Sequence, residues 1–185
     1  MEPTTSLPFE FEKEKFHHAM WIHGVNGVLD WEPALPDIGH EQIQGMIDSA
    51  SLMRFGTGIR IEMTGSLSGN FVVHFPIPTQ NIVAGHIRLH LQSIMLDFNA
   101  SAAVIGKVKV RDGNRAIASF TSLDLSGDHP LEVIEVIERP SIFKGVNVSL
   151  TLDGALGGKG IVVFRAVGIN MFQKIGMLPP TLESQ

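Results

Sequence analysis

Hydrophobic and polar residues alternate with a period of two along most of the chain between residues 16 and 173. This period is typical of β-strands that cover a core with one face. In the segment 17–24 it places His17, Ala19, Trp21 and His23 on one face and the even-numbered residues on the other. The alternation therefore predicts that the ordered part of the chain begins with a strand.

The same pattern predicts about nine or ten strands, near residues 17–24, 28–32, 59–63, 71–75, 86–98, 102–110, 116–120, 131–138, 146–152 and 161–167. Turn residues predict hairpins at Asn26–Gly27, at Arg111–Arg115 and across the glycine-rich segment 153–160. Residues 131–138 could also form a short helix after Pro130, but their β-branched residues favour a strand.

One segment has a helical period. In residues 40–54, apolar side chains recur at intervals of three and four, at positions 43, 46, 47, 50 and 53. Gly45 and the serines at 49 and 51 weaken this pattern, so a pair of strands is the competing interpretation. The prediction for the whole chain is an all-β protein, a jelly-roll-like antiparallel β-sandwich with at most one or two short helices.

The composition fits one domain. The chain has 185 residues, and this length is enough for a full core. Hydrophobic residues make up 44% of the chain and charged residues only 18%, and this apolar composition suggests a homo-oligomer. We expect a flexible N-terminal arm over residues 1–15, a single β-sandwich domain over residues 16–173 and a C-terminal tail over residues 174–185. Phe9 and Phe11 alternate with glutamate and would let the arm add to a sheet edge.

Charge and cysteine content narrow the possible partners. A net charge of −5 without a basic region argues against nucleic acid and anionic membranes as partners. The sequence has no cysteine, no secretory signal pattern and no apolar run long enough to span a bilayer. We therefore expect a soluble cytoplasmic protein without a cofactor.

The first strand offers the best candidate for a ligand site. One of its faces presents Trp21 between His17 and His23, an aromatic plate beside two groups that titrate near neutral pH. Against this stands the interpretation that both faces are covered and Trp21 lies in the core, where most tryptophans are found. The core interpretation is favoured.

Histidines are also candidate metal ligands. His18 or His23, together with His74 and an acidic residue such as Asp128, would be chemically adequate for a divalent metal in a jelly roll. No spacing in the sequence shows that they converge, and the paired histidines of a cupin-type centre are absent, so no metal is predicted. A single hydrogen-bonded core histidine is the simpler interpretation of His74.

Catalytic groups are not evident. Ser126, Asp128 and His129 lie together in one predicted loop, but neighbours in a loop rarely face each other as a catalytic triad does, so turn capping is the favoured interpretation. His86 and His90 share a strand face about 13 Å apart, which is too far to bind one metal ion. We interpret them as part of a solvated polar stripe.

Four segments together resemble a family of small bacterial proteins of unknown function. They are His18–Gly24, His74–Thr79, Val110–Gly113 and Leu125–His129. The resemblance runs from about residue 17 to about residue 172, and it implies a β-sandwich fold. It brings no activity and no catalytic residues.

The sequence thus favours a non-catalytic β-sandwich that binds a small ligand, or itself, through His17, Trp21 and His23. The alternative is a histidine-dependent enzyme, with or without a metal, such as a cyclase, isomerase or hydrolase of a small apolar substrate. Its candidate catalytic residues are His23, His74, Asp128 and His129. A carbohydrate-binding module is a weaker hypothesis, because the chain has no tyrosine and only two tryptophans to stack on a sugar.

Overall fold

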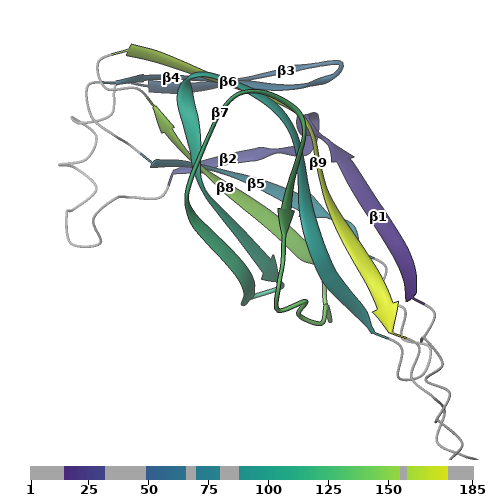
Figure 1. Ribbon diagram of the computed structural model, residues 1–185. Helices are drawn as coiled ribbons and strands as arrows, with labels where there is room; N and C mark the ends of the chain where they lie inside the picture. Colours follow the sequence, from purple (N-terminus) through teal and green to yellow (C-terminus); the bar gives the residue numbers. More distant parts are fainter. Residues whose placement is uncertain (1–14, 32–48, 66–69, 80–87, 155–157, 175–185) are drawn as a thin grey trace, which may run out of the picture.

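The computed structural model describes residues 15–31, 49–65, 70–79, 88–154 and 158–174. These residues form nine strands and one turn of 3₁₀ helix, and all strand pairs are antiparallel (Figure 1). The elements are β1 (Lys15–His23), η1 (Gly24–Asn26), β2 (Val28–Trp31), β3 (Ser49–Phe55), β4 (Gly58–Gly65), β5 (Asn70–Ile77), β6 (Leu89–Asp112), β7 (Arg115–Glu135), β8 (Val146–Gly154) and β9 (Gly158–Lys174). The predicted all-β antiparallel sandwich is confirmed.

Two long strands, β6 and β7, run through both layers of the sandwich. The first half of β6 pairs with β9, and its second half pairs with β8. β7 lies along the other side of β6. The first layer therefore contains β1, β3, β4 and β9, and the second contains β2, β5 and β8, with β6 and β7 common to both. Figure 1 shows β6 arching from one layer into the other.

The bend between the layers is built from unusual backbone conformations. Ala102 in β6 has a φ of 49°, and opposite it in β7 Ser122, Asp124 and Gly127 have φ values of 58°, 50° and 90°. The pairing register shifts at the same place. Extra residues and left-handed conformations bend a strand sharply without breaking its ladder. The predicted strands 86–98 and 102–110 are therefore parts of one strand from Leu89 onward.

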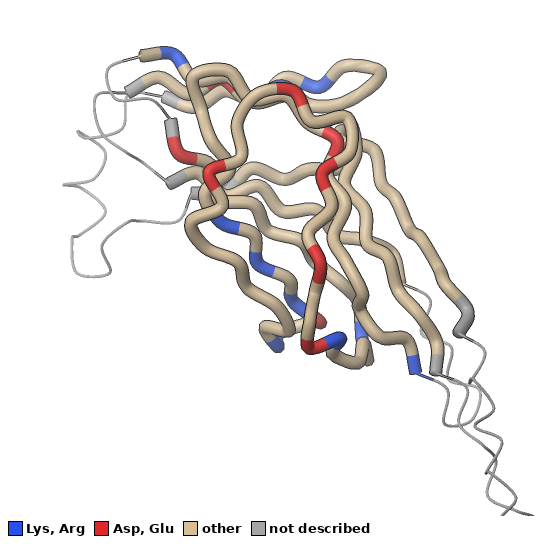
Figure 2. Tube along the Cα trace, viewed as in Figure 1, with Lys and Arg blue, Asp and Glu red and all other residues tan. Residues whose placement is uncertain are grey.

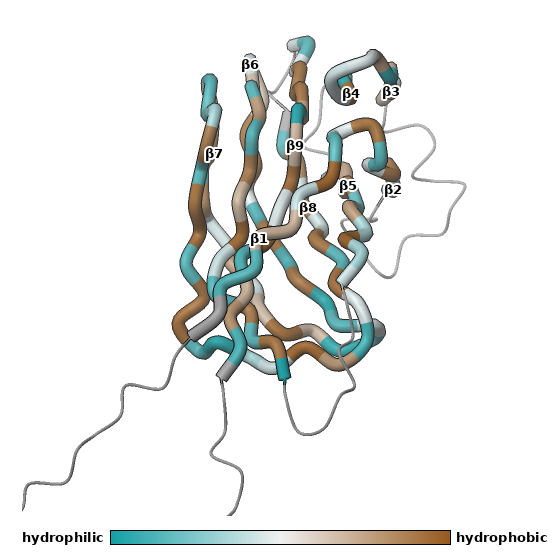
Figure 3. The backbone as a smooth tube through the Cα atoms, turned by 90° about the vertical axis from the view of Figure 1, so that its right-hand side faces the viewer, coloured by the Kyte–Doolittle hydropathy of each residue, from teal (hydrophilic) through white to brown (hydrophobic). Residues whose placement is uncertain are grey.

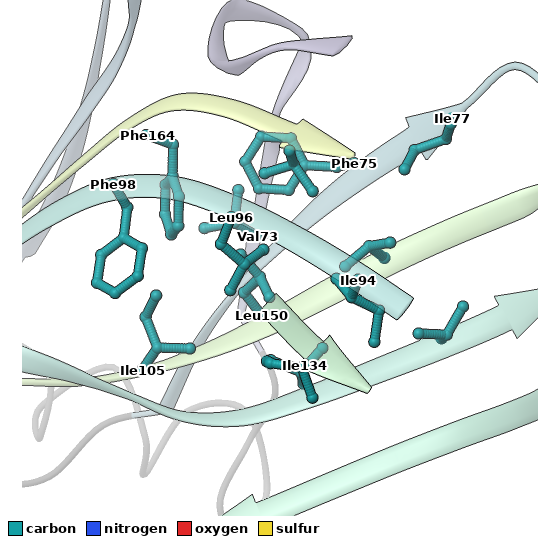
Figure 4. Close-up of a cluster of buried hydrophobic side chains, with 14 of the residues drawn as sticks. Val73, Phe75, Ile77, Ile94, Leu96, Phe98, Ile105, Ile134, Leu150 and Phe164 are labelled. Atoms are coloured by element: carbon teal, nitrogen blue, oxygen red, sulfur yellow. The ribbon is translucent and has the colours of Figure 1, made fainter. Parts of the chain in front are cut away.

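The core lies between the layers. Phe75 meets Phe164 edge to face at 5.3 Å between ring centroids, and Phe164 lies 6.3 Å from Phe98. Leu96, Val73, Leu150 and other aliphatic side chains fill the space around them (Figure 4). Figure 3 shows hydrophobic and hydrophilic positions alternating along the strands, as expected for sheets with one buried face.

The predicted hairpin at Asn26–Gly27 is wrong. β1 pairs with β9, whereas β2 pairs with β5, so the segment between them crosses from one layer to the other. Gly27 has an ordinary φ of −64° and is not needed for a turn. A Cβ atom there would lie 2.6 Å from Ile59 Cδ1 and 2.8 Å from Phe75 Cε1, so the glycine is required for close packing.

Three other local predictions also changed. β8 and β9 do not pair as a hairpin, because both of them flank β6. Residues 125–130 belong to β7 and its bulges, where a loop was predicted. Residues 49–55 form β3, which pairs with β4, so this part of the predicted helix is wrong and is a strand, as the competing interpretation expected for it. The turn at Arg111–Arg115 and the strand after Pro130, which runs to Glu135, are confirmed.

Some predictions lie outside the described residues. They are the N-terminal arm up to residue 14, the helix over residues 40–48, His86 and the tail from residue 175.

A buried carboxylate closes the end of the β6–β7 hairpin. Asp112 accepts hydrogen bonds from the backbone N–H groups of Phe143, Lys144 and Gly145 at 2.9, 2.7 and 3.1 Å. Arg115 adds an ion pair at 3.3 Å. Burial raises the pKa of the Asp112 carboxyl, but the three amide bonds and Arg115 outweigh this effect and hold the pKa below its usual value.

Replacing this carboxylate should destabilise the protein in a pH-dependent way. We expect Asp112→Asn to lower the free energy of unfolding by about 2–3 kcal/mol at pH 7, because amide donors lose their charged acceptor. Because the folded-state pKa is lowered, this contribution is complete above the usual value of 3.8 and is lost as the pH falls through the folded-state pKa. Urea unfolding at pH 7 and at pH 3 measures both effects.

Asp124→Asn is the matched control, because Asp124 is exposed on β7 and asparagine tolerates its left-handed conformation. Its effect should stay within about 0.5 kcal/mol. Equal losses in the two variants would contradict the anchoring role of Asp112.

Candidate functional site

Trp21 lies on the outer face of the first layer. The alternation predicted for β1 is correct: His17, Ala19, Trp21 and His23 are exposed, whereas Ile22 is buried. The Trp21 side chain is 43% exposed. The interpretation of Trp21 as a core residue is therefore wrong for this chain.

The indole of Trp21 rests on a glycine of the neighbouring strand. Gly168 of β9 lies directly opposite Trp21. A Cβ atom on Gly168 would lie 2.7 Å from Cδ2 and 2.8 Å from Cε3 of the indole, so these ring carbons occupy the space where a side chain would stand. One face of the ring is thus supported by the sheet, and nearly half of the residue remains open to solvent.

An apolar row continues from Trp21 across four strands. In register with Trp21 and Gly168 stand Met95 of β6 and Val133 of β7. Val133 is 43% exposed, and Met95 is half-buried. With neighbouring strands about 4.8 Å apart, the row is about 14 Å long. We call these four residues the Trp21 platform.

Polar residues border the Trp21 platform on one side. The next row across the same strands contains Ala19, Asn170, Ser93 and Glu135. Asn170 is partly exposed and Glu135 is exposed, so an amide and a carboxylate stand beside the apolar row. Such an arrangement can hold a ligand that has an apolar face and a polar edge.

The other candidate histidines of β1 lie at different distances from Trp21. His23 is two residues away on the same face, about 7 Å along the strand, and His17 is four residues away, about 13 Å. The Nδ1 atom of His17 lies 3.1 Å from Oε1 of Gln92 on β6, so the two side chains bridge over β9. Trp21 and His23 are therefore close neighbours, and His17 stands one row beyond the polar row, in register with Phe172.

The structure does not bring the proposed metal ligands together. His18 lies on the inner face of β1, whereas His74 lies on the outer face of β5 in the other layer. The Nδ1 atom of His74 is 2.8 Å from the Ser149 hydroxyl. Within the part of the chain that the structure describes, no three His, Cys, Asp or Glu side chains form a group that could hold a metal ion. His74 as a core residue is also wrong, since it is partly exposed on the outer face.

Asp128 belongs to an ion-pair cluster. Arg165 donates from Nε to Asp97 at 2.5 Å and from Nη2 to Asp128 at 2.8 Å. The register between β6 and β9 shifts beside Asp97, which leaves Arg165 as the extra residue of a bulge. The Arg165 guanidinium and the side chain of Asn99 hold the pKa of Asp128 below its usual value. Arg165 thereby ties β6, β7 and β9 together.

His129 has partners at both ring nitrogens. Its Nδ1 lies 2.9 Å from Glu132 Oε2, and its Nε2 lies 2.9 Å from the carbonyl oxygen of Ser126. The ring stacks on Phe98 at 4.8 Å between centroids. These contacts fix the orientation of the His129 ring on β7, which indicates a structural role. Its carboxylate partner, Glu132, was not among the candidate residues.

Several residues of this region could not be selected from the sequence. Gly168, Met95 and Asn170 lie on distant strands and become neighbours of Trp21 only through the register. Arg165 and Asp97 carry no motif. The alternation in β9 was the one available signal, because it placed residues 166, 168 and 170 on a single face.

Filling the space at Gly168 should displace the indole. Gly168→Ala would place its methyl group against the Trp21 ring and 2.8 Å from the carbonyl oxygen of Met20, so we expect a loss of about 1–3 kcal/mol of stability. The emission spectrum of Trp21 should change as well. Tryptophan fluorescence in a Trp31→Phe background and urea unfolding measure these two effects.

Gly56→Ala is the control, since a Cβ atom at Gly56 meets nothing within 4 Å. It should leave both the spectrum and the stability close to those of the parent. An unchanged Trp21 spectrum in Gly168→Ala would contradict the seating of the indole on this glycine.

Comparison with known proteins identifies a family but no characterised relative. The model of a family of unknown function, DUF6623, matches residues 16–168, which confirms the expected family of unknown function. A search of curated proteins finds no match to this sequence. Among the described residues, no helix has the length and apolar character needed to cross a membrane.

Solved structures with a similar fold share little sequence with the chain. An exo-β-1,3-galactanase from Phanerochaete chrysosporium, solved with galactose, is 13% identical to this chain, with a TM-score of 0.38. The alignment covers 82% of this chain and 29% of the galactanase, so the chain spans under a third of that protein. TmCBM61, solved with β-1,4-galactotriose, is 10% identical with a TM-score of 0.39 and coverages of 74% and 97%. A Stig cyclase from Fischerella is 8% identical with a TM-score of 0.34 and coverages of 84% and 86%.

Proposed function

The chain belongs to DUF6623, a family of unknown function, and we propose that it is a non-catalytic β-sandwich protein that binds a small ligand on the Trp21 platform. The observation that carries the proposal is the indole of Trp21, which is supported from below by Gly168 and is 43% exposed. Trp21 continues into an apolar row with Met95 and Val133, and apolar side chains that lie next to one another on a surface are a feature of binding sites.

The geometry favours a ligand with one flat apolar face and polar edges. An aromatic plate binds such a face by stacking, as in aromatic pairs and in the stacking of bases on proteins. Asn170, Glu135 and the His17–Gln92 pair stand along one side, where they can accept or donate hydrogen bonds. A pyranose ring has both features, so we propose a short oligosaccharide as the class of ligand.

The histidine-dependent enzyme receives less support. His74 lies on the second layer, His129 has structural partners at both nitrogens, and Asp128 is paired with Arg165. His23 is near Trp21 on β1 but has no acidic partner among the hydrogen bonds and ion pairs of the described residues. A general base needs both a neighbour that orients it and a ring nitrogen that can accept a proton from a substrate. Glu132 orients His129, but both ring nitrogens of His129 already have partners within the protein.

Self-association is the second candidate function for the same region. Leu131 is 57% exposed and lies on β7, and Ile137 is 89% exposed and lies just after it; both are near Val133, the member of the Trp21 platform that is 43% exposed. Apolar residues gathered at a sheet edge favour contact with another subunit. Native mass spectrometry of the freshly purified protein reports subunit number and retained ligand in one measurement.

Removing the indole should weaken ligand binding without unfolding the protein. With cellotriose and β-1,4-galactotriose as probes, we expect at least one of them to shift the fluorescence of Trp21 and to bind in calorimetry. Trp21→Ala should weaken that binding at least tenfold, as for an aromatic residue at the centre of an interface.

Phe55→Ala, on the edge strand β3, is the matched control, because it removes an exposed aromatic side chain at another place. It should leave the affinity unchanged. If Trp21→Ala changed neither the subunit number nor any ligand-induced shift in melting temperature, the assignment of this site would be wrong.

A further inference from the structure

The second layer carries a row of three basic residues on its outer face. Lys107, Lys109 and Arg111 occupy alternate positions of β6, and all three are partly exposed, whereas Val108 and Val110 between them are fully buried. Figure 2 shows these basic positions in a line along one strand. Alternate residues of a strand are about 7 Å apart, so the three charges span about 14 Å. We call these three residues the basic row.

No acidic side chain forms an ion pair with the basic row within the part of the chain that the structure describes. Among the described residues, neither lysine forms an ion pair, and Arg111 donates only to the carbonyl oxygen of Asn114 at 3.3 Å. The adjacent Asp112 is buried and already bound to three backbone amides. Three like charges on neighbouring outward positions repel one another, so their arrangement favours an anion that lies along the strand.

Polar groups stand on both sides of the basic row. On β7, the exposed Ser119 and Thr121 are opposite Lys109 and Lys107. On β8, Ser149 and Asn147 are opposite Lys109 and Arg111, and the Ser149 hydroxyl is within 2.8 Å of the His74 ring. Ser149 is buried, whereas the exposed hydroxyl groups of Ser119 and Thr121 can exchange hydrogen bonds with a ligand that carries hydroxyl groups as well as charge.

Asn147 adds a specific reason to expect a ligand with hydroxyl groups. Its Oδ1 atom is shielded from solvent and has no hydrogen-bond partner in the described part of the chain. A buried acceptor is costly unless a donor reaches it. The hydroxyl of a sugar is a donor and the oxygen of a phosphodiester is not, although such a contact requires the long side chains nearby to move aside.

We propose that the basic row binds a linear acidic glycan, with carboxylate or sulfate groups paired to Lys107, Lys109 and Arg111. A single-stranded nucleic acid fits less well, because proteins that bind it stack its bases on aromatic residues. The described outward positions of β5, β6, β8 and residues 115–121 of β7 contain no Phe or Trp. This site lies on the layer that does not contain Trp21, and it does not rest on the function proposed above.

Binding to two acidic glycans tests the inference. A fluorescent oligogalacturonate supplies carboxylates and a heparin oligosaccharide supplies sulfates, each titrated with the full chain at low salt and at 0.5 M NaCl. We expect at least one of them to bind, and the affinity to fall as salt screens the charges. Lys107→Gln/Lys109→Gln should weaken binding about tenfold, the combined effect of two exposed charge contacts.

The matched control is Arg139→Gln/Lys159→Gln, which removes the same charge outside the basic row. It should change the affinity less than twofold, as should Trp21→Ala. Absence of binding to both glycans, or equal losses in the two double variants, would overturn the proposal. Tighter binding of oligo-dT than of either glycan would also overturn it, in favour of a nucleic-acid surface.

Discussion

The bend in β6 and β7 is the constraint on which the rest of the structure depends. Because both strands leave one layer and continue in the other, the two sheets share a single set of buried residues between them. The left-handed conformations at Ala102, Ser122 and Asp124 are unfavourable for residues with a Cβ atom. They persist because the pairing with β8 on one side of the bend and with β9 on the other fixes the path of the chain.

Arg165 reinforces the first layer at this bend. The bulge in β9 turns its side chain toward Asp97 of β6 and Asp128 of β7, so one guanidinium joins three strands. The same residue donates to the carbonyl oxygen of Phe98, which is the first residue of β6 after the register shift. Asp97 is in register with Ala166 and His23, in the row next to the Trp21 platform, so this contact also fixes the sheet beside that platform.

Local patterns predicted local structure well and distant pairing poorly. The period of two identified the faces of β1 correctly, including the exposure of His17 and His23. It did not show that the Trp21 side chain would be exposed to solvent. The position of this side chain depends on Gly168, which is 147 residues further along the chain. The wrong hairpin at Asn26–Gly27 has the same cause. A glycine that is needed for packing against Phe75 cannot be distinguished in the sequence from a glycine that is needed for a turn.

The bend itself was hidden from sequence for a related reason. The segment 99–101, Asn-Ala-Ser, reads as a break between two strands, whereas the ladder to β9 continues to Ser101. In 122–127 Leu123 and Leu125 alternate with polar residues, as in a strand, but serine, aspartate and glycine usually terminate strands and obscure this signal. Here these residues supply the conformations that a sharp bend requires. The sequence therefore identified candidate residues that lie on a single strand, β1. It did not identify those that neighbouring strands contribute to the same face.

The bend also separates two outer surfaces of different chemistry on one pair of strands. The first half of β6 contributes Met95 to an apolar row, and the second half contributes Lys107 and Lys109 to a charged one. In a straight strand, Met95 and the two lysines would lie on one continuous face. The apolar row and the charged row would then share the same neighbouring strands. Because β6 changes layer between them, each surface has its own partner strands, β9 for the apolar row and β8 for the charged one. Substitutions in one surface should consequently act independently of the other, as expected for sites without shared contacts.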